Sequence, residues 1–563
     1  MATDAAQKPQ AHPHSFLGHA KIISALTLVS RVFGVLRESV WANYFGTGVV
    51  SSAFTIAFTI PNLFRKLFGE GALSAAFIPL YTKALKTQSL EEANRFAAAS
   101  VNLLFLILLA ITLIGEGILL GMIWFGHGMR LDLLLTLKLT AIMLPYVVLI
   151  CGTAFLGAIL QVHRRFAAPA AAPILLNICH IVVMVIGGWI LGLRLASTDT
   201  ERFAQQLRLA NWLAAFVLVA GVGQIAMLLP SLRAVGFRFQ RTGWLWNAQI
   251  RQMLLMSIPV AMAAGVLQIS VLMDKGISAV LAQGIDQAGA MVTHFTLFGH
   301  TVPYPMELGA VKRLDWAQVL YQFPLGVFAI ALATAIFPGL SADALDKNRE
   351  QFKATFRTGI EATLFEGFAA SVGLIIVREQ AIRILLKYGR VNDHDVELIA
   401  RSLGIYACGI WAYSMQQIIN RAYYALHDTK TPFIMSMVNI AINLVIEIPL
   451  LWTHLGESAM AVGTTVSFAI QSLLMLYMLR NRIGGLGLAS LARSAGKMIL
   501  AAGLMWGVCL AVQYAPFWPH GTGKMISLAQ LVLLMAIGGG VYLGTCQVLG
   551  VRTLSELLHR RGR

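Results

Sequence analysis

Apolar runs of about 20 residues recur along nearly the whole chain and are separated by short polar connections. A helix of that length crosses the hydrocarbon core of a bilayer, which is about 30 Å thick. The pattern predicts an all-α integral membrane protein with about fourteen transmembrane helices. Their approximate centres are Val35, Ala57, Ile107, Val147, Val182, Val219, Leu267, Ile330, Val372, Trp411, Leu444, Ser467, Leu504 and Leu534.

The composition agrees with this pattern. Of 563 residues, 57% are hydrophobic and 12% are charged, whereas soluble globular chains carry about 25% charged residues. A water-soluble enzyme is therefore excluded. Five cysteines lie singly in apolar runs, without the spacing of a metal site or a disulfide framework, and no complete phosphate-binding loop is present. We expect no catalytic residue, metal or cofactor, so a coupling ion or the membrane potential would supply any energy.

The net charge is +17, from 43 Lys and Arg against 26 Asp and Glu. In a soluble protein this balance would favour nucleic acid or acidic partners. Here the basic residues gather in alternate connections, such as 83–95 and 233–241, which the positive-inside rule assigns to the cytoplasm. We therefore expect no nucleic-acid partner and two cytoplasmic termini, a polar N-terminal tail at 1–19 and a basic C-terminal tail at 552–563.

Proline-centred segments repeat at a fixed distance, since 263 residues separate Pro61 from Pro324 and also Pro169 from Pro432. Internal repeats of this kind are typical of transporters. We predict an N-lobe of six spans, a C-lobe of six spans with an outer insertion, and two further spans. Their ranges are 20–240, 241–485 with the insertion at about 283–313, and 486–551.

Basic side chains interrupt the first two spans at Arg31, Arg37 and Arg65. A charge at a helix centre costs about 2.5–3.5 kcal/mol even on the lenient insertion scale, so it must face a hydrated cavity or a partner. Arg31 and Arg37 lie about 120° and about 9 Å apart on a helix. Arginine pairs bidentately with phosphate and stays charged when buried, which favours an anionic cargo. Alternatively, Arg31 and Arg37 snorkel, and Arg65 and Lys66 cap the inner helix end.

The second half carries fewer charges within its spans. Asp274 and Lys275 form either a functional pair or part of the outer interface, and both interpretations stay open. Glu366, five residues after Glu361, belongs either to a hydrated helix face or to a site that titrates during transport. Carboxylates would suit export of an organic cation better than export of an anion.

Three segments near the N-terminus resemble the MurJ/MviN family of lipid II flippases. They are Ser30-Arg-Val-Phe-Gly-Val-Leu-Arg37, Ile60-Pro-Asn-Leu-Phe-Arg-Lys-Leu-Phe-Gly-Glu-Gly-Ala72 and Phe77-Ile-Pro79, with further likeness at Gln322-Phe-Pro324 and Asp428-Thr-Lys-Thr-Pro432. The resemblance implies the fold of the multidrug/oligosaccharidyl-lipid/polysaccharide exporter superfamily, with two six-helix lobes around a central cavity. It also implies that the spans in 486–551 form a groove for a lipid tail.

By this resemblance, Arg31, Arg37 and Arg65 would hold the pyrophosphate of the cargo, with Glu70 beside them. Accessory positions would be Lys66, Asn62, Ser52, Asp274 and Lys275, and the flexing points would be Pro61 and Pro324. Ser52 stands where the family usually has an acidic residue, and Gln318-Val319 stands where it usually has Asp-Arg. Lys275, or Lys312 and Arg313, are alternative sources of the missing charge.

The resemblance implies a transporter, not an enzyme. It would move the undecaprenyl-pyrophosphate-linked peptidoglycan precursor, lipid II, from the inner to the outer leaflet of the bacterial cytoplasmic membrane by alternating access. Lipid II and membrane lipids would be its partners, and we expect a monomer. Two alternatives remain, a cation-coupled drug exporter of the same fold that uses Glu366 or Asp274, and a non-transporting scaffold for envelope synthesis.

Overall fold

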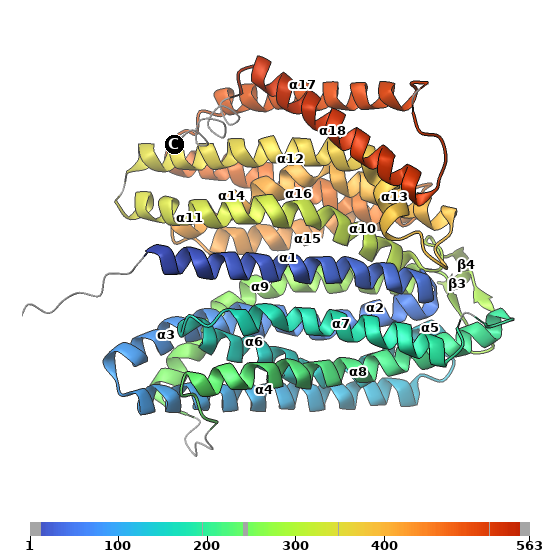
Figure 1. Cartoon of the computed structure of the whole chain (residues 1–563), viewed down its shortest axis with the longest axis horizontal. Coiled ribbons are helices and arrows are strands. Elements are labelled where there is room, and N and C mark those ends of the chain that lie inside the picture. The colour runs from blue at the N-terminus through green and yellow to red at the C-terminus, as the bar shows by residue number, and fades with distance from the viewer. Residues whose placement is uncertain (1–12, 194, 240–245, 347, 517, 552–563) are drawn as a thin grey trace, which may run out of the picture. The chain divides into compact units, whose positions relative to one another are not determined.

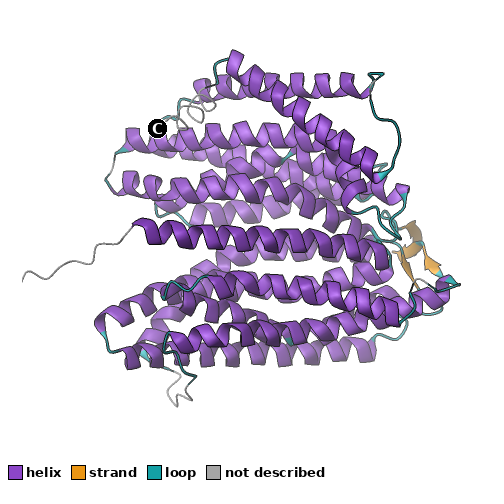
Figure 2. Cartoon of the chain, viewed as in Figure 1, coloured by secondary structure: helices purple, strands orange, loops and turns teal. Residues whose placement is uncertain are grey.

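The computed structural model describes residues 13–193, 195–239, 246–346, 348–516 and 518–551. Helices dominate, and among the described residues strands occur only between 284 and 303 (Figure 2). The prediction of an all-α fold is confirmed, with two small hairpins inside the predicted insertion. Residues 1–12 of the predicted N-terminal tail and the whole predicted C-terminal tail lie outside the described residues.

The first half of the chain forms a series of long helices joined by short turns (Figure 1). Local sequence sets their ends: for example, Ser89 and Glu92 form a capping box that starts α4. The elements are α1 (Pro13–Tyr44), α2 (Val49–Phe64), the π-helix η1 (Arg65–Ala72), α3 (Leu73–Thr87), α4 (Leu90–Phe125), α5 (Leu131–Met143), α6 (Tyr146–Val162), α7 (Ala167–Ile190), α8 (Asp199–Ala234) and α9 (Ala248–Leu281).

Two antiparallel hairpins follow α9, β1 (Gly284–Ile285) with β2 (Met291–Val292) and β3 (His294–Leu297) with β4 (His300–Pro303). The rest of the chain is again helical. Its elements are α10 (Ala310–Pro324), the π-helix η2 (Leu325–Ala329), α11 (Ile330–Leu345), α12 (Arg349–Leu385), α13 (Asp393–Cys408), α14 (Ile410–Ala425), α15 (Lys430–Leu451), α16 (Ser458–Ile483), α17 (Leu488–Gln513) and α18 (Lys524–Val548).

The chain divides into two compact units. Unit 1 comprises Met1–Trp41, Ala57–His127 and Leu137–Ala264, and unit 2 comprises Ala42–Ile56, Gly128–Thr136 and Gly265–Arg563. Unit 2 thus includes two short connections, 42–56 and 128–136, that come from the first half of the sequence. Within unit 2, α17 and α18 pack against each other and against α12 (Figure 1).

Nine helices among the described residues are long and apolar enough to cross a membrane, or ten if α5 and α6, which meet at a 46° bend, form one span. Each of the fourteen predicted centres lies in a helix, but the count of fourteen is not confirmed. Some of these helices are short: α2 and α14 have 16 residues each, which is less than the roughly 20 that a straight span requires.

The outward face of α4 carries large apolar side chains. Leu113, Ile114 and Ile118 are 63%, 65% and 59% exposed. Fully burying a side chain of this size is worth about 1.5–3 kcal/mol, so a row of them in water would be strongly unfavourable. A lipid environment around this helix removes that cost, in agreement with the hydropathy of the sequence.

In one of the two repeated pairs, Pro61 and Pro324, each proline stands close to a π-helix. η1 begins four residues after Pro61, and η2 begins directly after Pro324. Proline has no N–H for the helical ladder, and its ring clashes with the carbonyl four residues earlier; in both segments the widened turns lie on the C-terminal side of the proline. The two halves of the chain therefore share a structural irregularity as well as a sequence spacing.

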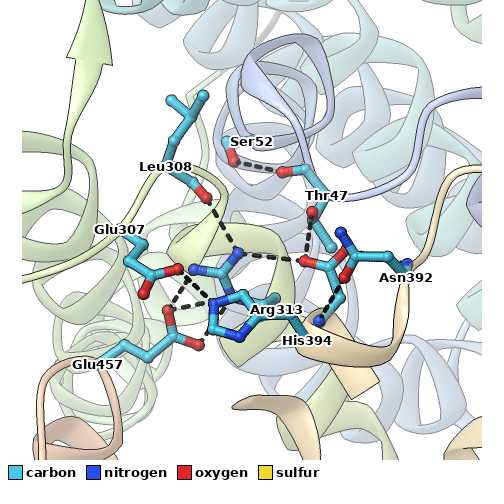
Figure 3. Close-up of polar contacts among 9 residues, drawn as sticks. Thr47, Ser52, Glu307, Leu308, Arg313, Asn392, His394 and Glu457 are labelled. Carbon is cyan, nitrogen blue, oxygen red and sulfur yellow. Dashed lines mark hydrogen bonds and ion pairs between the residues drawn. The ribbon is translucent and has the colours of Figure 1, made fainter. Parts of the chain in front are cut away.

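A buried arginine joins three parts of unit 2 (Figure 3). The side chain of Arg313, in the first turn of α10, is 3% exposed and donates to the Glu457 carboxylate, with Nη2 to Oε2 at 2.6 Å. It also donates to Asp395 at 3.3 Å and to the Leu308 carbonyl at 3.0 Å. The Thr47 hydroxyl donates to the same Asp395 carboxylate at 2.8 Å. Arg313 thus connects the 42–56 segment, α13 and the start of α16.

A second arginine fixes the hairpin insertion. Arg130 pairs with Asp132 at 2.6 Å and lies 4.8 Å from the centre of the Tyr304 ring. Its guanidinium also donates to the carbonyls at the end of α9, and Asp132 accepts from the backbone N–H of Ile285. The insertion is therefore fastened to the 128–136 segment.

We expect Arg313→Ala to lower the stability of the protein by about 3–5 kcal/mol, because it leaves two buried carboxylates without their cation. Thermal unfolding in detergent measures this as a lowered Tm. Arg95→Ala is the matched control, since Arg95 and its partner Glu91 are both exposed and such pairs contribute about 0–1 kcal/mol. Equal Tm values for the two variants would contradict the assignment.

Candidate functional site

A cavity of about 450 Å³ lies inside unit 1 and contains two of the predicted arginines. It is bounded by α1, η1, α3, α6, α7 and α8. Its polar lining combines cations with neutral hydrogen-bonding groups and, among the described residues, includes no carboxylate. The polar lining residues are Arg37, Arg65, Ser74, Thr153, Gln161, Asn177 and Gln224.

Arg37 enters the cavity from α1, and its side chain is 23% exposed. Its Nη1 donates to Asn177 Oδ1 at 3.2 Å, and its Nη2 donates to Glu38 Oε1 at 2.5 Å. The guanidinium is thus held from two sides, by an amide on α7 and by the neighbouring carboxylate on its own helix.

Arg65 is the first residue of η1, four residues after Pro61, and lines the same cavity. The neighbouring Lys66 is exposed and does not line it. Arg31, six residues before Arg37 on α1, is half-buried and is not among the described lining residues. The side chain of Glu70 lies outside the described part of the structure. The structure therefore brings Arg37 and Arg65 together.

Two accessory positions have local roles. Asn62 donates to the Phe58 carbonyl at 2.9 Å, one turn earlier on α2. Ser52 donates to the Thr47 carbonyl at 3.4 Å and lines a hollow of about 20 Å³ within unit 2. Neither side chain lines the arginine cavity.

Unit 2 has its own polar cavity, of about 160 Å³, and its chemistry differs. Asp274 of α9 lines it and accepts from Asn443 Nδ2 of α15 at 3.3 Å. Gln318 lines it as well and donates to the Tyr406 hydroxyl at 3.2 Å. No arginine or lysine is found among the described residues that line this cavity.

The basic residues considered as sources of the missing charge are engaged elsewhere in unit 2. Lys275 pairs with Asp315 at 2.6 Å, and Lys312 approaches the same carboxylate at 3.3 Å. Lys312 also lies 5.0 Å from the centre of the Trp316 ring. Arg313 belongs to the buried cluster with Glu457 and Asp395. Among these residues, none lines the unit 2 cavity.

A second feature of unit 2 is an apolar groove of about 910 Å³. Residues of α12, α14, α16 and α17 and the last residue of α13 form it, including Phe368, Trp411, Leu476 and Trp506. The helix α18 packs behind α12 and α17 and contributes none of the described lining residues. The groove therefore presents an apolar surface built from five helices.

Sequence reasoning did not identify the neutral residues of the arginine cavity as site residues. Gln224, 3% exposed, accepts from the Tyr146 hydroxyl at 3.1 Å and donates to the Ala172 carbonyl at 2.8 Å. Asn177 contacts Arg37. The available signal was an amide side chain in the middle of an apolar run, which points to a satisfied interior group but not to its partner.

A family model described as lipid II flippase MurJ matches residues 41–529. The chain belongs to the MurJ family. A Rhizobium tropici protein named probable lipid II flippase MurJ is 29% identical over 533 residues, which are 92% of each chain. A Burkholderia cenocepacia protein named lipid II flippase MurJ is 26% identical and covers 94% of this chain and 96% of its own length.

Solved structures agree on the fold. A lipid II flippase MurJ in an inward closed conformation gives a TM-score of 0.67 at 24% identity, over 92% of this chain and 98% of that one. An inward-facing MATE family transporter of the MOP superfamily gives 0.62 at 13% identity, over 84% and 99%. At these identities the likeness is one of fold. Membership of the MurJ family, together with the membrane-span helices, makes the chain a multi-pass inner-membrane transporter and not an enzyme.

We expect Arg37→Ala and Arg65→Ala each to weaken binding of undecaprenyl diphosphate by about tenfold or more, because each removes charge-assisted hydrogen bonds worth about 1.5–3 kcal/mol. Binding to the purified protein in detergent measures the change. Lys86→Ala is the control, since Lys86 is exposed in the last turn of α3. If all three variants bind equally well, the cavity is not the anion site.

Proposed function

We propose that this chain moves lipid II from the inner to the outer leaflet of the bacterial cytoplasmic membrane by alternating access. The observation that carries the proposal is the cavity in unit 1, where Arg37 and Arg65 face one space inside a membrane-spanning unit. Family membership supports the cargo, because the matching family is described as that of a lipid II flippase.

In this proposal the diphosphate of the cargo binds the Arg37 and Arg65 guanidinium groups. Two permanently charged, planar donors suit the two phosphate groups, since arginine pairs bidentately with phosphate oxygens. We further propose that Arg31, which lies on α1 outside the described cavity lining, supplies a third cation, and that Lys66 and Glu70 of η1 act as accessory groups. Thr153, Gln161 and Gln224 offer neutral hydrogen bonds to the polar headgroup.

The apolar groove of unit 2 would hold the polyprenyl tail. Its lining is almost entirely aliphatic and aromatic, and α17, one of the two helices beyond the repeated halves, supplies one wall. A hydrocarbon tail gains about 25 cal/mol for each Å² of apolar surface it buries from water. Against lipid that gain is small, so the groove guides the tail without trapping it.

Alternating access requires helices that bend, and the π-helices beside Pro61 and Pro324 are suited to this. The membrane potential or a coupling ion would reset the carrier, since moving one charge across the membrane is worth about 2.3 kcal/mol per 100 mV. We place both termini in the cytoplasm and expect a monomer.

The two alternatives are weaker. Drug exporters of the MATE family share the fold at 13% identity, whereas relatives named as lipid II flippases align over more than nine tenths of the chain at up to 29% identity. A non-transporting scaffold would have no need for two arginines inside a cavity, where uncompensated charge is costly.

Reconstituted vesicles provide the test of function. Wild-type protein should move fluorescent lipid II between leaflets. Arg37→Ala should lower the rate by about tenfold or more, because the variant loses charge-assisted hydrogen bonds to the diphosphate. The same variant should fail to support growth of cells that depend on this protein, while Lys86→Ala should support it. Wild-type vesicles that move lipid II no faster than protein-free vesicles would refute the proposal.

The groove makes a separate prediction. Gly503 lines the groove, and Gly507, one turn later on α17, does not; a Cβ at either position would meet nothing within 4 Å. Gly503→Trp should therefore fold, fill the groove and slow movement of lipid II with a full-length tail, while Gly507→Trp should behave like wild type. The measurement is the flipping rate in vesicles. Equal rates for both variants would exclude the groove as the tail site.

A further inference from the structure

Asn177 occupies a special position in the arginine cavity. The residue is 8% exposed, and its side chain reaches from α7 to two points about two turns apart on α1. Asn177 Oδ1 accepts from Arg37 Nη1 at 3.2 Å, and Asn177 Nδ2 donates to the Ser30 carbonyl at 3.3 Å. The two ends of one amide thus contact residues seven apart on the same face of a helix.

Gly34 lies beside the Asn177 amide, between Ser30 and Arg37 on the same face of α1. A Cβ added there would come 3.9 Å from Asn177 Nδ2, which is ordinary van der Waals contact. The carbonyl of Ser30 and the guanidinium of Arg37 also determine the orientation of the amide, since only Oδ1 can accept from the guanidinium and only Nδ2 can donate to a carbonyl.

The contacts of Arg37 leave it able to bind a ligand. A guanidinium has five N–H groups, and the hydrogen bonds to Asn177 and Glu38 use two of them. The remaining N–H groups belong to a side chain that lines the cavity. An arginine held at one edge keeps its other donors in a defined direction, whereas a long unrestrained side chain loses about 2 kcal/mol of rotamer entropy when a ligand immobilises it.

The neutrality of asparagine also matters. A carboxylate at this position would accept from Arg37 equally well, but it would add a second negative charge beside Glu38 and reduce the attraction for an anion. An amide orients the guanidinium without compensating its charge.

Unit 2 contains a related contact of opposite polarity. Asn443 of α15, the helix that begins beside Pro432, donates to Asp274 of α9 at 3.3 Å. In each unit, an asparagine on the helix that begins with the repeated proline contacts a charged side chain on another long helix. In unit 1 the amide turns its oxygen to a cation, and in unit 2 it turns its nitrogen to a carboxylate.

We propose that Asn177 is a positioning residue for diphosphate recognition, which acts by holding the Arg37 guanidinium in the cavity. The proposal rests on the function proposed above, because it assigns Asn177 a role in binding the same cargo. A purely structural tie between α1 and α7 is the competing explanation, and the experiment must separate the two.

A double-mutant cycle with undecaprenyl diphosphate as the probe does so. Asn177→Ala should weaken binding by about tenfold in the otherwise wild-type protein, as expected for a lost hydrogen bond to a charged group. In the Arg37→Ala background the same change should have no further effect, because its target is gone. Asn177→Asp, which keeps the acceptor and adds charge, should also bind more weakly than wild type.

Asn94→Ala is the matched control. Asn94 accepts from the Tyr81 hydroxyl at 3.3 Å and donates to the Gly236 carbonyl at 3.1 Å, so it makes the same kind of double contact, outside the cavity. It should lower the Tm in detergent and leave binding unchanged. Asn177→Gln, measured in parallel, checks whether a longer amide restores part of the affinity.

The outcomes are distinguishable. If wild-type protein binds the probe but Asn177→Ala binds it equally well, or loses the same factor in the Arg37→Ala background, the positioning role is wrong and the proposed function stands. If wild-type protein does not bind undecaprenyl diphosphate or lipid II, the proposed function fails and the positioning role fails with it.

Discussion

The structure depends on how each cation within the apolar interior is compensated. Transfer of an ion from water into a low-dielectric interior costs several kcal/mol even after relaxation, so every interior arginine must have a partner or a hydrated space. Arg313 has two carboxylates and a carbonyl and is almost fully buried. Arg37 has one carboxylate and one amide and faces a cavity. The first arrangement stabilises the fold, and the second leaves attraction for a ligand.

This difference also explains what could be predicted from the sequence. Apolar runs and the charges within them are visible residue by residue, so the helical membrane fold and the position of Arg37 and Arg65 at a cavity could be anticipated. The acidic partner that compensates each interior cation is not visible in the local sequence. Glu457 is 144 residues from Arg313, and no local pattern indicates that they meet. Arg313 was therefore considered as a spare cation, although its charge is used within unit 2.

Backbone irregularities were predicted only in part. A proline inside an apolar run indicates a disturbed helix, and the spacing of Pro61 and Pro324 indicated that the disturbance is repeated. The sequence pattern does not specify its form, a π-helix in both cases, because the widened turn also depends on packing around it. The number of spans was also hard to predict. A criterion of about 20 apolar residues per span does not fit helices that are broken or only 16 residues long.

The two units differ most in the charge of the residues that line their polar cavities. Unit 1 turns Arg37 and Arg65 into its cavity, whereas the cavity of unit 2 contains Asp274 and amides. Val319, at the position of the missing arginine, is apolar and 48% exposed. The nearby cations of unit 2 form ion pairs with Asp315, Asp395 and Glu457. Coulomb attraction falls with distance and with each compensating charge, so in the proposed function unit 1 would supply most of the attraction for a diphosphate, and unit 2 would supply the apolar surface.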